Sequence, residues 1–267
     1  MNDAGWRGQS AYGIRFDWGA AGAAALGAEA LVVVDVLSFS TAVCVAADRG
    51  TAVYPFRWRD DRAAAFAAAH DAVLATGRGA ATAAHPWTLS PAALRAAPAV
   101  PRLVLPSPNG STIAAATPAP RVVAGCLRNA RAVAAHLAAD GLGTPDRPVA
   151  VTAAGERHPD GSLRPALEDL LGAGAIIAAL LATGDGAVPS PEAEAAAACA
   201  AGTRDVPAAV AGCASGRELV GRGFPQDVEI AAEPDTSRGV PILADGAFRR
   251  APVRPGAARP CRGTTGG

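Results

Sequence analysis

The residues most capable of chemistry follow the apolar run LVVV at 31–34, which ends at the carboxylate of Asp35. An unbroken run of this kind is typical of a strand buried on both faces. Ser38, Ser40 and Thr41 come next, and the small apolar residues at 42–47 predict a helix that begins there. In an open α/β sheet, ligands bind just beyond the carboxyl ends of strands, and a helix N-terminus there attracts an anion. Asp35 is placed to hold a divalent metal beside such an anion.

A second stretch repeats this layout. A strand predicted over 102–105 runs into Asn109-Gly110, a turn signal, and then into Ser111 and Thr112 before another small apolar segment. Gly110 lets the backbone approach a ligand closely, and the hydroxyls either bind phosphate or cap the helix. The repeated order indicates an internal duplication. It also predicts that two separate strand exits converge on one anion.

Each acidic candidate has a second interpretation. Asp35 either holds a metal or caps the helix that follows it, and because it lies early for a cap we favour the metal. Glu168 and Asp169 fall in the first turn of a helix predicted over 165–183, where acids stabilise the helix dipole without any function. Because the two are adjacent they point to different faces, so at most one is expected to reach a site.

Several reaction classes are excluded by the sequence. There is no lysine, which excludes Schiff-base chemistry and a Walker-type phosphate loop. The four histidines are scattered without HxxxH or HxH spacing, which argues against a zinc hydrolase. No GxSxG motif is present either, so no serine nucleophile is indicated. Asp227 and Asp235, near late predicted strands, are weaker candidates than Asp35.

The amino-acid composition limits the classes of binding partner and the cellular compartment that we expect for this protein. The 267 residues are 50% hydrophobic but only 4% aromatic, so the core must be built from Ala, Val and Leu. The formal charge is zero, which gives no electrostatic reason to expect nucleic acid or an anionic membrane as a partner. Five widely spaced cysteines without a CxxC pair suit a reducing cytoplasm. We see no signal peptide, and the longest apolar segment, 170–183, is too short to cross a bilayer.

These patterns predict a three-layer α/β/α fold with a mixed, largely parallel sheet, which an internal duplication would divide into two intertwined lobes. The domain is expected over 14–248, followed by a disordered Arg-, Pro- and Gly-rich tail at 249–267. Strands are predicted at 14–16, 31–34, 51–55, 102–105, 121–124, 149–152, 226–231 and 240–243. Helices are predicted at 18–26, 42–47, 60–75, 113–116, 129–140, 165–183, 191–202 and 207–222, with a long irregular connection at 76–101.

An ordered set of motifs resembles the 2-phosphosulfolactate phosphatase family. The segments are VVVDVLSFSTAV at 32–43, SPNGST at 107–112, GCLRNARAVA at 125–134, AAGE at 153–156, LEDLLGAGAI at 167–176 and SGRELVGRGFPQDV at 215–228. The resemblance extends over about 14–243. It implies an α/β fold peculiar to the family and a magnesium-dependent hydrolase that removes phosphate from a 2-phosphorylated 3-sulfo acid. In some organisms that step leads to coenzyme M.

The chain departs from the family pattern at three places. Ser38 stands where the family usually has an arginine, in a stretch like DVLRAST. A GER-like stretch is reduced to Gly77-Arg78-Gly79, and an FDLGNSP-like stretch is WTLSP at 87–91. Arginine is the natural partner of a sulfonate or carboxylate, and Arg128 and Arg217 are the candidates to replace the missing one in space.

The interpretation we carry forward is a cytoplasmic, Mg²⁺-dependent phosphatase acting on a small 2-phosphorylated (sulfo)carboxylic acid such as 2-phospho-3-sulfolactate. The alternative is a non-catalytic or divergent family member that binds a different small phosphorylated or sulfonated acid. The expected partner is the substrate alone, with no nucleic acid and no membrane; a homodimer is allowed. The predicted site residues are Asp35, Asn109 and Glu168 for catalysis, Asp35 and Asp169 for the metal, and Ser40, Thr41, Gly110, Ser111, Thr112, Arg128 and Arg217 for the substrate.

Overall fold

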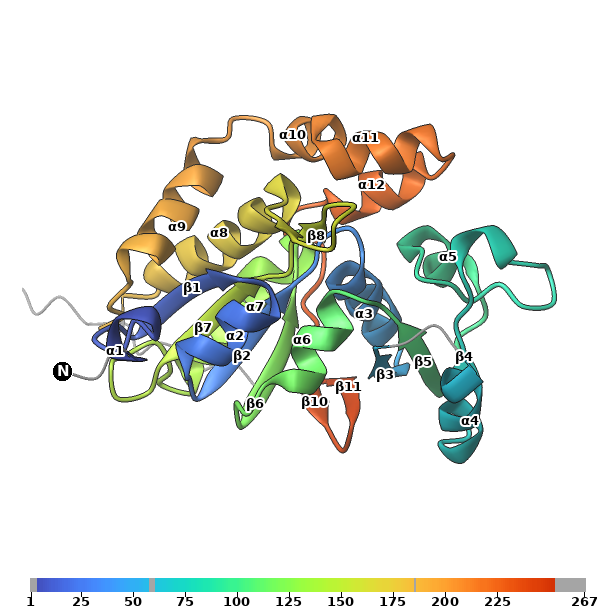
Figure 1. Ribbon diagram of the computed structural model, residues 1–267, viewed down its shortest axis with the longest axis horizontal. Coiled ribbons are helices and arrows are strands. Elements are labelled where there is room, and N and C mark those ends of the chain that lie inside the picture. The colour runs from blue at the N-terminus through green and yellow to red at the C-terminus, as the bar shows by residue number, and fades with distance from the viewer. Residues whose placement is uncertain (1–3, 58–60, 185, 253–267) are drawn as a thin grey trace, which may run out of the picture.

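One continuous sheet runs through the molecule (Figure 1). The computed structural model describes residues 4–57, 61–184 and 186–252. Within them the sheet contains β1 (Ile14–Trp18), β2 (Ala30–Val34), β3 (Ala52–Phe56), β4 (Val73–Leu74), β5 (Arg102–Pro106), β6 (Arg121–Gly125), β7 (Val149–Ala153), β10 (Pro241–Ala244) and β11 (Ala247–Arg250). A separate hairpin pairs β8 (Glu156–Arg157) with β9 (Leu163–Arg164).

The strand order divides the sheet into two parallel parts. The order is β1-β7-β2-β6-β10-β11-β3-β5-β4. Pairing is parallel among β1, β7, β2 and β6, and again among β3, β5 and β4. The antiparallel hairpin β10–β11 joins the two parts through one pair of residues on each side. The predicted mixed, largely parallel sheet is confirmed, and the predicted lobes correspond to parts of a single sheet. The internal duplication stays a prediction.

Helices cover both faces of this sheet (Figure 1). Val32 and Val34 of β2 face a core formed with α7 (Ala130–Ala139), α8 (Leu167–Leu181) and α9 (Pro191–Gly202). Leu31 and Val33 face the opposite core, formed with α2 (Gly19–Leu26), α3 (Phe39–Asp48) and α6 (Gly110–Ala116). All five residues of β2 are buried, as the unbroken apolar run predicts. The three-layer α/β/α architecture is therefore confirmed.

The remaining helices lie around the sheet ends. They are α1 (Ala4–Arg7), α4 (Asp61–Ala69), α5 (Pro91–Ala96), α10 (Val206–Gly212), α11 (Ala214–Gly221) and α12 (Pro225–Ala231), with short 3₁₀ turns η1 (Arg78–Ala80) and η2 (Leu127–Asn129). In Figure 1 the group α10–α12 lies near the β8–β9 hairpin. Helix α12 also packs against α5 from the 76–101 connection.

Three predicted elements were wrong in type or extent. The segment 226–231 is not a strand but helix α12, because Pro225 occupies its first turn and tertiary contacts override the alternating pattern. The helix predicted over 60–75 ends at Ala69, since Asp71 has a φ of 47° and β4 then pairs with β5. The helix predicted over 207–222 is two helices, α10 and α11, which meet at Cys213.

At the C-terminal end, Arg249 and Arg250 belong to β11 rather than to a tail. The rest of the predicted tail, from 253 onward, lies outside the described residues. No helix within the described ranges combines the length and apolar character that crossing a membrane requires.

Candidate active site

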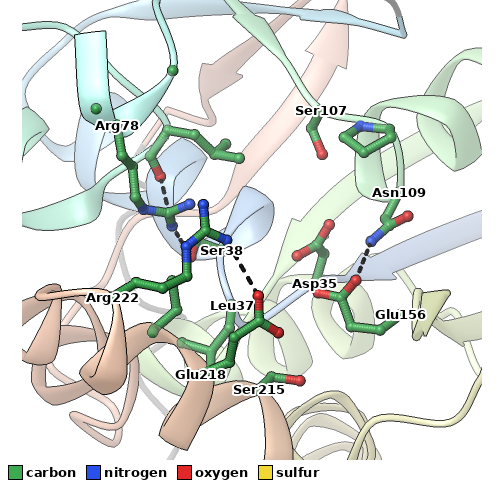
Figure 2. A pocket seen from close by; sticks show the side chains of 15 residues that line it. Asp35, Leu37, Ser38, Arg78, Ser107, Asn109, Glu156, Ser215, Glu218 and Arg222 are labelled. Carbon is green, nitrogen blue, oxygen red and sulfur yellow. Dashed lines mark hydrogen bonds and ion pairs between the residues drawn. The ribbon is translucent and has the colours of Figure 1, made fainter. Parts of the chain in front are cut away.

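A pocket of about 350 Å³ opens beyond the carboxyl ends of β2, β5 and β7 (Figure 2). We call it the reaction pocket. It is lined by Asp35, Leu37, Ser38, Gly77, Arg78, Gly79, Leu89, Ser107, Pro108, Asn109, Glu156, Ser215, Glu218, Leu219 and Arg222. Most of these residues come from the turns after three parallel strands, from η1 and from α11; Glu156 begins β8, and Leu89 precedes α5. This is the edge of an α/β sheet where ligands bind.

Asp35 joins the two strand exits. Its Oδ1 accepts a hydrogen bond from the backbone N–H of Phe39 at 3.0 Å, and its Oδ2 accepts one from Gly110 at 2.9 Å. Phe39 and Gly110 are the first residues of α3 and α6, so one carboxylate caps two helices. The predicted convergence of the two turns is present. Two of the helix N–H groups that the sequence predicts as donors to a substrate anion, those of Phe39 and Gly110, donate to Asp35. Anion binding at these helix starts stays a prediction.

Gly110 is required for this approach. A Cβ at this position would lie 2.3 Å from the Phe39 ring and 2.9 Å from Asp35 Oδ2. Any larger residue would push the β5–α6 turn away from the carboxylate. Gly110 therefore positions the turn against Asp35; its predicted contact with the substrate stays a prediction.

Two buried acids in the first turn of α8, Glu168 and Asp169, contact the segments that form the pocket. Asp169 accepts hydrogen bonds from the backbone N–H groups of Val36 at 2.7 Å and Gly155 at 2.8 Å, which fixes the turns after β2 and β7. The thiol of Cys213 donates to Glu168 Oε2 at 3.2 Å. Both acids are almost fully buried and neither lines the reaction pocket. Their predicted metal and catalytic roles stay predictions.

Glu156 is the second carboxylate that lines the pocket. Asn109 Nδ2 donates to its Oε2 at 3.1 Å, so the predicted Asn109 lies beside a residue that we had not selected. Burial, and then the negative charge of Asp35, raise the pKa of Glu156 to about 7. Burial also raises the pKa of Asp35. We call Asp35 and Glu156 the acid wall.

Two arginines form the opposite, basic wall. Arg78 Nη2 donates to Ser38 Oγ at 2.6 Å, and its Nε donates to Asp227 at 2.8 Å. Arg222 follows α11 and donates to Glu218 at 3.2 Å. Figure 2 shows both guanidinium groups on one side of the pocket and the acid wall on the other. Like Glu156, Arg78 and Arg222 are functional candidates that the sequence analysis missed, although Arg78 lies in the Gly77–Gly79 stretch identified by resemblance.

Asp227 anchors the basic wall. Its side chain is 1% exposed, and its Oδ1 accepts hydrogen bonds from the Ser90 hydroxyl and from the Ala92 backbone N–H. The same carboxylate binds Arg78 through Oδ2. One residue of α12 thus holds the 76–101 connection against the pocket.

The four predicted hydroxyl ligands are used within the fold. Ser40 donates to Val33 O at 2.8 Å, Thr41 to Val36 O at 2.8 Å, Ser111 to Leu105 O at 3.3 Å and Thr112 to Pro108 O at 2.6 Å. None of these four lines the reaction pocket. The hydroxyls that do line it belong to Ser38, Ser107 and Ser215.

The two predicted arginines lie elsewhere. Arg128 is buried, forms an ion pair with Glu233 and donates to the carbonyl of Ile230 at 3.4 Å. Arg217 is exposed on α11 and does not line the pocket. Their predicted substrate roles remain untested, but the structure does not bring them to the acid wall.

Asp35 and Glu156 are the residues of the acid wall that could hold a magnesium ion. Among the described residues, no three His, Cys, Asp or Glu side chains are close enough to hold an ion together. Mg²⁺ usually binds through one or two carboxylates, with water or substrate oxygens completing its shell. Asp35 and Glu156 would supply such a pair of oxygen donors.

Comparison with protein families gives one extended match. The model described as 2-phosphosulpholactate phosphatase matches residues 22–246, from α2 to the β10–β11 turn, and thus includes both walls of the pocket. No match to a curated protein was found. Since the matched region is most of the sequence and includes every strand of the sheet except β1 and β11, the chain belongs to the 2-phosphosulpholactate phosphatase family.

Proposed function

We propose that this protein is a Mg²⁺-dependent phosphoric monoester hydrolase that converts a small 2-phosphorylated (sulfo)carboxylic acid, such as 2-phospho-3-sulfolactate, into the hydroxy acid and phosphate. The family description supports a phosphatase. The observation that carries the proposal is the division of one pocket into an acid wall and a basic wall. A substrate with a phosphate at one end and another anionic group at the other end matches this division once a cation is bound.

The acid wall cannot bind phosphate alone. Asp35 and Glu156 are both partly desolvated carboxyl groups, and like charges close together in a protein interior repel. A divalent cation between them and the phosphate would convert this repulsion into attraction. When bound, Mg²⁺ polarises the phosphoryl group and lowers the pKa of a bound water.

The chain's own residues bind and orient the substrate. Arg78 and Arg222 present guanidinium groups suited to a carboxylate or sulfonate. Ser38 and Ser107 offer hydroxyl donors. The apolar side chains of Leu37, Leu89 and Leu219 limit the amount of water in the pocket. Asn109 fixes the orientation of Glu156 through its amide.

Phosphate release from a panel of phosphate esters tests this proposal. The panel contains 2-phospho-3-sulfolactate, 2-phospholactate, a sugar phosphate and an aryl phosphate, each with Mg²⁺ or with a chelator. We expect release from the two 2-phosphorylated acids only when Mg²⁺ is present. Binding of these acids without any release would instead support the non-catalytic alternative, and release that is equal in the chelator would exclude the metal.

A further inference from the structure

The basic side of the reaction pocket contains an acidic residue as well as two arginines. Among the described residues that line the pocket, the charged ones outside the acid wall are Arg78, Arg222 and Glu218. Glu218 lies one helical turn before Arg222, and its Oε1 accepts a hydrogen bond from Arg222 Nη1 at 3.2 Å. Figure 2 shows the Glu218 carboxylate directed toward the Arg222 guanidinium. The part of the pocket that suits an anion therefore carries a negative charge of its own.

The stability of the fold does not explain Glu218. Its side chain is 62% exposed and that of Arg222 is 65% exposed, and an ion pair in water contributes little to stability. Asp227, in contrast, is buried, does not line the pocket and fixes the position of Arg78. The charge of Glu218 is thus free to act on a molecule that enters the pocket.

Two carboxylates offset the two guanidinium charges of the basic wall. Asp227 accepts a hydrogen bond from Arg78, and Glu218 accepts one from Arg222. The wall therefore offers several N–H donors but little net positive charge. A sulfonate or carboxylate has one negative charge, which these donors can match. A group with two negative charges loses more hydration on entering the pocket and finds no added positive charge to replace it.

We propose that Glu218 is a specificity-determining residue, which restricts the basic wall to a singly charged group such as a sulfonate or carboxylate and excludes a doubly charged one. This inference rests on the proposed function, because it assigns the ester phosphate of the substrate to the acid wall. The exclusion arises from repulsion between the Glu218 carboxylate and the second charge. Repulsion of this kind is a common way for a binding site to reject a close analogue of its ligand.

Two substrates of the same shape that differ by one charge test the inference. One is 2-phospho-3-sulfolactate, and the other carries a phosphonate in place of the sulfonate. Both groups are tetrahedral and have three terminal oxygens, and the carbon–phosphorus bond of the phosphonate is not an ester. With Mg²⁺, at a pH where the phosphonate is fully ionised, we expect kcat/KM of the wild type to favour the sulfonate by about tenfold. Equal use of the two substrates, or a preference for the phosphonate, would overturn the inference.

Two matched variants assign the preference to one residue. Glu218→Gln keeps the shape of the side chain and removes its charge, so the sulfonate-to-phosphonate ratio of kcat/KM should fall by about three- to tenfold. Glu229→Gln removes an exposed carboxylate of α12 that does not line the pocket, and should leave the ratio unchanged. A purely structural role of Glu218 would change kcat/KM for both substrates equally. An unchanged ratio in Glu218→Gln, or an equal fall in Glu229→Gln, would therefore overturn the inference.

Failure of the proposed function can be told apart from failure of this inference. If neither ester releases phosphate, the affinities of the two esters are measured by calorimetry in the presence of Mg²⁺. Tighter binding of the sulfonate by the wild type, with a smaller difference in Glu218→Gln, would support the role of Glu218 even without catalysis. Equal affinities in the wild type, or the same preference in both proteins, would exclude it.

Discussion

The two walls of the reaction pocket are built in different ways. Asp35 of the acid wall is held by backbone N–H groups at the starts of α3 and α6, and it is only 6% exposed. Arg78 of the basic wall is held by the side chains of Ser38 and Asp227, which lie 40 and 149 residues away in the chain. One wall belongs to the sheet framework, whereas the other depends on side-chain contacts between segments that are far apart in the sequence.

This difference suggests that the acid wall serves the chemical step and the basic wall serves substrate selectivity. A carboxylate fixed by main-chain donors cannot move without disturbing two helices, so its position is suited to a constant task such as holding a cation and phosphate. Arg222 is exposed, whereas Arg78 lies in η1 and pairs with the buried carboxylate of Asp227, so the basic wall is held by side chains and not by backbone donors. We therefore expect substitutions in the acid wall to affect turnover and those in the basic wall to affect substrate affinity.

The largest effect is expected for Asp35→Asn. Loss of the charge should reduce phosphate release at saturating substrate by about 10³-fold, as for other electrostatic groups at a reacting centre. One amide N–H₂ would also face a backbone donor, so stability should fall by about 1–2 kcal/mol. Asp48→Asn is the control, since Asp48 ends the same helix and accepts a hydrogen bond from Ser237 at 2.9 Å. Normal turnover in a folded Asp35→Asn variant would remove Asp35 from the mechanism.

Arg78→Ala should act mainly on affinity. Loss of one charged contact to an anionic group is expected to raise KM by about 10- to 100-fold with a smaller change in kcat. Asp227→Asn should shift KM in the same direction by less, because Arg78 is retained but loses its anchor. Steady-state kinetics of both variants would measure this. A large fall in kcat with unchanged KM would place Arg78 in the chemical step instead.

Gly110→Ala tests the framework of the acid wall. The added Cβ meets the Phe39 ring at 2.3 Å, so we expect a loss of about 1–3 kcal/mol in the free energy of unfolding. Gly202→Ala is the matched control, because nothing lies within 4 Å of its added Cβ at the end of α9. Denaturant unfolding compares the two; equal stability would mean that the turn is not packed against Asp35.

The smallest effect is a pH dependence of stability in the metal-free protein. The pKa of Glu156 rises from 4.5 to about 7 on folding, so the folded state binds the proton more tightly than the unfolded state. The contribution of Glu156 to the free energy of unfolding is therefore fully present below pH 4.5 and is lost as the pH rises toward 7. The loss should be on the order of 1 kcal/mol after screening by solvent. Urea unfolding midpoints measured between pH 4.5 and 8 should fall with rising pH in the wild type and fall less in Glu156→Gln. The same pH dependence in both proteins would contradict the raised pKa of Glu156.

The acid wall was partly predictable because its signals are local. The apolar run before Asp35 and the turn at Asn109-Gly110 indicated two strand exits, and parallel strands bring such exits to one edge. Glu156 was missed as a functional residue because nothing near it in sequence announces its burial beside Asp35. That burial arises from the β8–β9 hairpin, which is a tertiary feature.

The basic wall could not be predicted from local patterns. Arg78 lies in a segment without periodicity, and its partner Asp227 lies on a helix whose alternating residues indicated a strand. The same limit applies to the hydroxyls of Ser40 and Ser111: their position at helix starts was correct, but only the fold shows that they donate to carbonyls of the preceding strands. Residue type and spacing identified the edge of the sheet, and long-range packing decided which side chains face the pocket.

The most direct test is the Mg²⁺ concentration that gives half-maximal phosphate release, measured for the wild type and for Glu156→Gln with 2-phospho-3-sulfolactate. If Asp35 and Glu156 together hold the cation, removing one carboxylate charge should raise this concentration by at least about tenfold. The same half-maximal concentration in both proteins, or phosphate release that needs no Mg²⁺ at all, would contradict the assignment of the acid wall as the metal site.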